Sequence, residues 1–126
     1  MDKGVEVRKP AVAGMFYPAD PETLRKEIET CLERVELDRT ALDILGLVAP
    51  HAGYMYSAQV AAYAYRQVRG RHYDTVVVIS PSHREAFGYS SVFGGHSYLT
   101  PLGEVMVDIE TVSAIEASGS RLVRVG

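Results

Sequence analysis

Two short apolar runs constrain the fold of this chain more than any other feature. Residues 44–49 and 74–79 are rich in leucine, isoleucine and valine, and each run is followed by a proline and then by a histidine, His51 or His83. Such runs are typical of strands that are covered on both faces of a parallel sheet. Proline cannot donate to a sheet ladder, so each strand is expected to end there.

The segment between the two runs has the pattern of a helix. Ser57 is the predicted cap and Gly70 the predicted stop. Strand, helix and strand within roughly forty residues predict a βαβ unit, which is parallel and right-handed. The expected core face of this helix carries Val60, Ala61, Ala64, Tyr65 and Val68.

A second helix is predicted before the first run. Asp20-Pro21-Glu22 combines a capping side chain, a proline at the first helical position and an acid in the first turn. Cys31 lies at the edge of the apolar stripe, where we expect it to act as a small hydrophobic residue. The stripe repeats at helical spacing through Leu24, Ile28, Leu32 and Val35.

The C-terminal part predicts a β-hairpin followed by a helix. Residues 89–93 and 104–107 alternate like strands, and 100–103 have the composition of a turn. Asp108 is the expected cap of the next helix, Gly119 its expected end, and Leu122 to Val125 read as a further strand. The fold class predicted is α/β, with a parallel-centred sheet of βαβ units flanked by helices.

The composition indicates one soluble domain over residues 1–126. The chain is 47% apolar and 23% charged, and its net charge of −3 argues against a nucleic-acid partner. No apolar run approaches the ~20 residues of a membrane span, and the N-terminus lacks a signal core, so a cytoplasmic protein is expected. A sheet of few strands leaves an edge uncovered, which favours either a homo-oligomer or a longer domain.

His51 and His83 are the candidate ligands of one metal ion. They are 32 residues apart (83 minus 51), and each follows the carboxyl end of a predicted strand, where open α/β sheets bind ligands. Strands about 4.8 Å apart would let both imidazoles reach one ion. Two separate hydrogen-bonded loop histidines are the alternative. His72 is expected at the opposite end of the sheet, and His96 in a turn.

Two histidines make an incomplete site. A structural zinc requires four protein ligands, whereas non-haem iron uses two histidines, one carboxylate and open positions. Glu85 and Asp108 are the weak candidates for the carboxylate. Phosphate loops, serine-hydrolase elbows and paired cysteines do not occur in the sequence, which disfavours those functions.

Four motifs in order resemble the Memo family, found in archaea and bacteria as the B component of the AmmeMemoRadiSam system. They cover nearly the whole chain. The motifs are Arg8-x-Pro10-Ala11-Val12-Ala13-Gly14-x-Phe16-Tyr17-Pro18, Ala49-Pro50-His51-Ala52-Gly53-Tyr54-x-Tyr56-Ser57, Ser80-Pro81-Ser82-His83 and Thr100-Pro101-Leu102-Gly103.

This resemblance implies a fold shared with class III extradiol dioxygenases and a site for iron or copper. His51 and His83 match two of the metal ligands, and Phe16 and Tyr56 match aromatic positions that line the pocket; we add Tyr54 as their neighbour. Family members are longer. The chain therefore resembles an N-terminal half, and the remaining ligand and a general base are expected outside it.

Three functions follow as expectations. The first is a metal-dependent redox enzyme of the dioxygenase kind, with His51 and His83 as ligands. The second is a non-catalytic module that binds a metal, a small molecule or a peptide in a pocket of Phe16, Tyr54 and Tyr56. The third is a fragment with no activity of its own.

Overall fold

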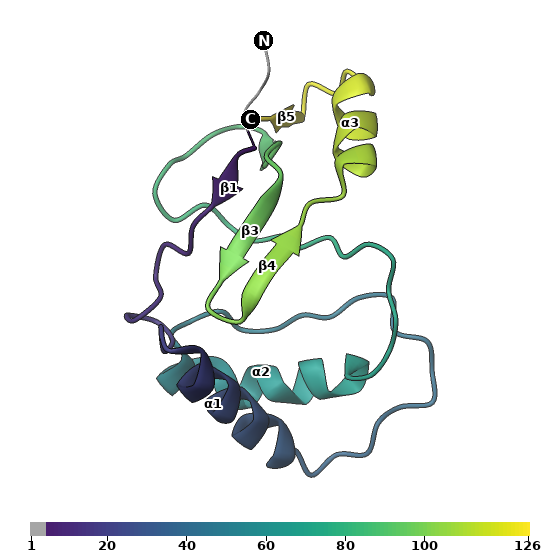
Figure 1. Ribbon diagram of the computed structural model, residues 1–126. Helices are drawn as coiled ribbons and strands as arrows, with labels where there is room; N and C mark the ends of the chain where they lie inside the picture. Colours follow the sequence, from purple (N-terminus) through teal and green to yellow (C-terminus); the bar gives the residue numbers. More distant parts are fainter. Residues whose placement is uncertain (1–4) are drawn as a thin grey trace. The chain divides into compact units, whose positions relative to one another are not determined.

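A computed structural model describes residues 5–126, which contain three helices and five strands (Figure 1). Residues 1–4 lie outside the described part. The chain forms two compact units, and each is described by itself. The helical unit is Pro10–His72. The sheet unit comprises Tyr73–Gly126 and the described residues up to Lys9. The single domain expected over residues 1–126 stays a prediction.

Helix α1, Pro21–Glu33, begins where its capping signals predict. The Asp20 carboxylate accepts hydrogen bonds from the Thr23 amide at 2.8 Å and from its hydroxyl at 2.6 Å. Proline occupies the first turn, where a missing N–H costs nothing. The predicted cap and start are confirmed, and the helix ends two residues before Val35.

Helix α2, Tyr54–Val68, begins three residues before the predicted cap, so that prediction was wrong. Gly53 is the capping residue and contributes no side chain, while the Tyr54 amide donates to the Phe16 carbonyl at 2.7 Å. The Ser57 hydroxyl donates to the Ala52 carbonyl at 3.0 Å. A backbone acceptor from outside the helix therefore replaces the expected serine cap. The helix ends just before Gly70, which has φ +74°, as predicted.

Helices α1 and α2 lie side by side (Figure 1). Leu24 of α1 and Ala62 of α2 are buried. The Gln59 side-chain amide donates to the Cys31 carbonyl at 2.9 Å, and Arg69 forms an ion pair with Glu29 at 2.6 Å. Within the described residues, no helix has the length and apolarity needed to cross a membrane.

The sheet unit contains a hairpin whose turn and second strand were predicted, whereas residues 89–93 are not its first strand. Strands β3, Ser97–Thr100, and β4, Gly103–Met106, pair antiparallel, and β1, Val7–Arg8, pairs parallel with β3. In the turn, the Thr100 hydroxyl donates to the Gly103 carbonyl at 2.8 Å. Gly103 has φ +133°, a conformation that favours glycine.

A second sheet in this unit joins segments that are distant in sequence. Strand β2, Ser90–Val92, pairs parallel with β5, Val123–Val125. Helix α3, Ile109–Ala117, packs against β5, and Asp108 caps it through the Thr111 amide at 3.0 Å. The predicted cap and the last predicted strand are confirmed. Gly119 follows α3 with φ +64°, as expected for a helix end.

The two apolar runs that led the sequence analysis are not strands here, which corrects the predicted βαβ unit. Residues 44–49 and 74–79 have no regular secondary structure. Leu45 is 100% exposed, Val48 98% and Ile79 91%. A strand needs a ladder partner and a covered face, and the described sheets are built from other segments. The mixed α/β class is confirmed, and so are the turn and the second strand of the hairpin.

Candidate functional site

A tight turn in residues 12–17 places the first aromatic residues of the site. The Gly14 amide donates to the Tyr17 carbonyl at 2.7 Å, and the Phe16 amide donates to the Val12 carbonyl at 2.9 Å. Gly14 has φ +81°, which an L side chain rarely adopts. Gly14 therefore suits this turn, which presents the Phe16 carbonyl to the start of α2.

Three of the predicted site residues line one cavity of the helical unit. Phe16 comes from the turn, His51 from the segment before α2, and Tyr54 from the first turn of α2. The cavity has a volume of about 590 Å³. The rest of its wall is mainly apolar and includes Val12, Ile28, Leu32, Ala61, Ala62 and Val68.

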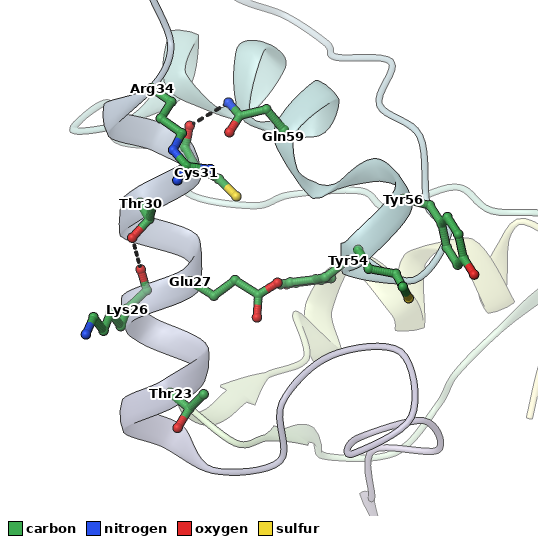
Figure 2. A pocket seen from close by; sticks show the side chains of 10 residues that line it. Thr23, Lys26, Glu27, Thr30, Cys31, Arg34, Tyr54, Tyr56 and Gln59 are labelled. Carbon is green, nitrogen blue, oxygen red and sulfur yellow. Dashed lines mark hydrogen bonds between the residues drawn. The ribbon is translucent and has the colours of Figure 1, made fainter.

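Tyr56 does not line this cavity. It is exposed, and it lines a second cavity of about 470 Å³ beside α1, where Tyr54 also contributes (Figure 2). Residues two positions apart on a helix point in different directions, and Tyr54 lines both cavities whereas Tyr56 lines only the second. The structure therefore places Tyr54, but not Tyr56, in the wall of the cavity with Phe16.

The phenol of Tyr54 has a raised pKa. Burial raises the pKa of its phenol, and the nearby Tyr17 and Glu27 raise it further. Figure 2 shows the Glu27 side chain extending from α1 toward Tyr54. The Tyr17 and Tyr54 rings lie 5.6 Å apart at 45°. Tyr54 therefore stays neutral at physiological pH and keeps a hydroxyl proton to donate.

Tyr17 and Cys31 also line the cavity of Phe16, His51 and Tyr54. The aromatic end of residues 8–18 allows two interpretations of the sequence, loop packing or a pocket that Phe16 and Tyr17 face, and both side chains line the cavity. Cys31 is the cavity residue that the sequence did not single out. The position of Cys31 on the edge of the α1 stripe gave no comparable signal, because that edge fits core packing equally well.

His83 lies in the sheet unit, in an exposed loop after residues 74–79. In that loop the Glu85 amide donates to the Ser82 hydroxyl at 3.2 Å. His51 belongs to the other unit, so a metal site shared by His51 and His83 stays a prediction. Within residues 5–126, no three or more histidine, cysteine or acidic side chains gather in a metal-binding group.

Asp108, a weak candidate for the third ligand, has a structural role. Its carboxylate accepts from the Thr75 hydroxyl at 2.6 Å, from the Thr111 hydroxyl at 2.7 Å and from the Thr111 amide. The Thr75 hydrogen bond, followed by those from Thr111, lowers the pKa of Asp108 to about 2. The carboxylate is thus used to cap α3 and to fasten the segment that carries Thr75.

The remaining histidines take no part in the cavity. His96 is exposed just before β3, and its backbone amide donates to the Glu6 carbonyl at 2.8 Å. This position agrees with the turn expected there. His72 is the last residue of the helical unit.

The fold and the cavity define a mixed α/β protein whose aromatic pocket is built from the turn before α1 and the start of α2. Comparison with known proteins makes the class specific. The family model for Memo-like proteins matches residues 8–123, so the chain belongs to the Memo family.

Archaeal relatives agree with this assignment. A MEMO1 family protein of Methanosarcina mazei is 42% identical over 106 residues, which are 84% of this chain and 38% of the relative. One from Methanothermobacter thermautotrophicus is 44% identical over 117 residues, covering 86% and 42%. One from Thermoplasma volcanium is 34% identical over 118 residues, covering 94% and 43%. The chain spans about two-fifths of the length of these relatives.

Proposed function

We propose that this chain contributes His51 and His83 as two imidazole ligands of an iron or copper site in a Memo-family domain. The observation that carries the proposal is the position of His51 in the wall of an apolar cavity beside Phe16 and Tyr54. Membership of the Memo family supports it further. A relation in fold to the class III extradiol dioxygenases belongs to the same proposal.

The donor atoms suit these metals, although the set is incomplete. Neutral imidazole is a good ligand for iron and copper, and an open iron site uses two histidines with one carboxylate. The described residues bring no third ligand to His51. The proposal is therefore a two-histidine contribution, with the third ligand supplied from outside the described residues.

The pocket residues have roles that follow from their contacts. Phe16 and Tyr54 wall the cavity beside His51, and this apolar wall would exclude water from a bound substrate. Tyr54 retains its phenolic proton and would donate a hydrogen bond to a ligand oxygen. When bound, an iron ion of this coordination type supplies open positions for dioxygen and substrate, which would make the protein a redox enzyme.

A second function is favoured by the cavity itself. Its volume of about 590 Å³ lies in the range of small-molecule pockets, and its wall is mainly apolar with few polar groups. A non-catalytic module that takes up a small molecule or a peptide would need only this pocket. In that case His51 acts as a hydrogen-bonding anchor rather than a metal ligand.

Metal titration of the 126-residue protein tests the first function. Iron(II) under anaerobic conditions and copper(II) should each bind one ion per chain. His51→Ala and His83→Ala should each weaken binding at least about tenfold, since even groups that only support a ligand commonly contribute that much. His96→Ala is the matched control and should bind like the parent protein. Equal affinity for the parent protein and both ligand variants would refute the site.

A variant of the cavity wall, Phe16→Ala, distinguishes the metal-dependent enzyme from the non-catalytic binding module. Phe16→Ala removes a wall residue without touching an imidazole, so it should leave the metal affinity within about twofold and reduce oxygen uptake with catechol substrates. Metal binding without any oxygen uptake in the parent protein would retain the site and remove the dioxygenase activity. Binding of a small aromatic probe that is lost in Phe16→Ala, with no metal bound, would favour the non-catalytic module.

A further inference from the structure

We propose that the cavity of about 470 Å³ between α1 and α2 binds a free amino acid with an apolar side chain, through its amine and its carboxylate together. Glu27 and Gln59 would receive the amine, and Arg34 would receive the carboxylate. The polar groups of this cavity differ from those of the cavity that holds Phe16 and His51. The inference therefore does not depend on the proposed metal site.

A buried acceptor in this cavity lacks a donor. The side-chain oxygen Oε1 of Gln59 is buried and has no hydrogen-bond partner within residues 5–126. The amide cannot turn over to relieve this, because its NH₂ group donates to the Cys31 carbonyl at 2.9 Å and a flipped oxygen would face that carbonyl. Buried polar atoms are nearly always paired, so this oxygen marks a place where an N–H group of a ligand would bind.

The wall of the cavity also holds an acid and a base that are not paired. Glu27 and Arg34 both line the cavity, and in the described part of the chain neither forms an ion pair. Seven positions separate them, which is about 10.5 Å along a helix. A ligand that carries both an ammonium and a carboxylate group would pair with each of them. The planar guanidinium of arginine suits a carboxylate in particular, because it offers two parallel N–H donors.

The directions of the charged side chains assign the two ends of the ligand. Figure 2 shows Glu27 extending from α1 toward the start of α2, whereas Lys26, which also lines the cavity, extends to the side away from α2. Arg34 is therefore the base that we assign to the carboxylate. The side chain of Gln59 contacts α1 at Cys31, between Glu27 and Arg34, so its free acceptor suits an amine bound between them.

The first turn of α2 gives the cavity an apolar side. Tyr54, Met55 and Tyr56 line the cavity there, and Met55 and Tyr56 are largely exposed. Aromatic and methionine side chains pack well against another apolar or aromatic group. An aromatic amino acid therefore fits this cavity better than glycine does. A simple anion or cation would leave one of the two charged side chains unpaired.

Calorimetric titration of the 126-residue protein with L-phenylalanine in a chelating buffer tests the proposal. We expect one molecule per chain, with a Kd of about 1 mM or tighter. Phenethylamine lacks the carboxylate and 3-phenylpropionate lacks the amine, so each should bind at least about fivefold more weakly. Because the buffer holds no free metal, the result is independent of the metal-site proposal.

Charge-removing variants identify which residue binds which end of the ligand. Glu27→Gln should weaken the binding of L-phenylalanine and phenethylamine about fivefold and leave that of 3-phenylpropionate unchanged. Arg34→Gln should weaken L-phenylalanine and 3-phenylpropionate and leave phenethylamine unchanged. Arg25→Gln is the matched control, because Arg25 is exposed on α1 and does not line the cavity, so this variant should bind like the parent protein.

The free acceptor has its own variant. Gln59→Met removes the amide and should weaken the binding of L-phenylalanine at least about tenfold, since hydrogen bonds to charged groups are the stronger ones. Equal affinity for L-phenylalanine and both analogues would overturn the proposal, as would no binding of L-phenylalanine at about 10 mM. Loss of L-phenylalanine binding in Phe16→Ala would also overturn it, because Phe16 lines only the other cavity.

Discussion

Helix α1 and the run at residues 44–49 were both predicted from clear sequence patterns, but only α1 has the predicted structure. The cap of α1 lies within three residues of the group that it binds, as Asp20 accepts from Thr23. A strand instead requires partners that are far away in the sequence. Leu24 of α1 is 3% exposed and Leu45 of the run is 100% exposed. The comparison shows that contacts between near neighbours are enough to form α1, whereas the run can form a strand only with distant segments that pair with it and cover it.

The largest expected effect is the difference in stability between the variants Leu24→Ala and Leu45→Ala. Leu24→Ala removes a buried side chain and should lower the free energy of unfolding by about 2–5 kcal/mol. Leu45→Ala removes an exposed side chain of the same type and should change that free energy by no more than about 0.5 kcal/mol. Urea unfolding followed by circular dichroism measures both. A large loss for Leu45→Ala would mean that the run is covered in solution.

The next effect concerns Asp108, which caps α3 through Thr111 and also accepts a hydrogen bond from Thr75, 33 positions away in the chain. Asp108 has a pKa of about 2, below its usual value, so its ionised form stabilises the folded state. That contribution is present above the unfolded pKa and is lost as the pH falls through about 2. Asp108→Asn should therefore destabilise the protein at pH 7 less than Leu24→Ala does.

The pH dependence provides the control for this cap. The difference in melting temperature between Asp108→Asn and the parent protein should shrink steadily between pH 4 and pH 2. Thr111→Val removes one hydroxyl donor to the same carboxylate and should reproduce part of the effect. A difference that does not change with pH would show that the ionised carboxylate is not the stabilising group.

The smallest expected effect lies on the surface of the helical unit. Arg69 and Glu29 form an ion pair at 2.6 Å, and both side chains are more than two-fifths exposed. Because solvent screens such pairs, a double-mutant cycle with Arg69→Ala and Glu29→Ala should give a coupling of about 0.2–1 kcal/mol. The coupling should decrease in 1 M salt. A larger, salt-independent coupling would require this pair to be buried.

The sequence predicted those parts of the fold that depend on near neighbours. The caps at Asp20 and Asp108, the stop at Gly119 and the turn at 100–103 all rest on contacts within a few residues. The start of α2 could not be predicted in this way. It is decided by the Phe16 carbonyl, which lies 38 positions before Tyr54 in the chain.

The candidate site was predictable to a similar degree. The family motifs singled out Phe16 and His51, and Tyr54 followed as their neighbour; the structure places all three in one cavity. Tyr56 was grouped with them because it is close in sequence, but the helix turns it toward the second cavity. The partnership of His51 with His83 depends on strand pairing, and this non-local property cannot be deduced from spacing alone.

Electron paramagnetic resonance of copper(II) in the 126-residue protein tests the central claim most directly. The account predicts a spectrum with hyperfine coupling to two imidazole nitrogens, reduced to one nitrogen in His51→Ala and likewise in His83→Ala, and unchanged in His96→Ala. A spectrum with one coupled nitrogen in the parent protein, or one that His83→Ala leaves unchanged, would contradict a metal site shared by the two histidines.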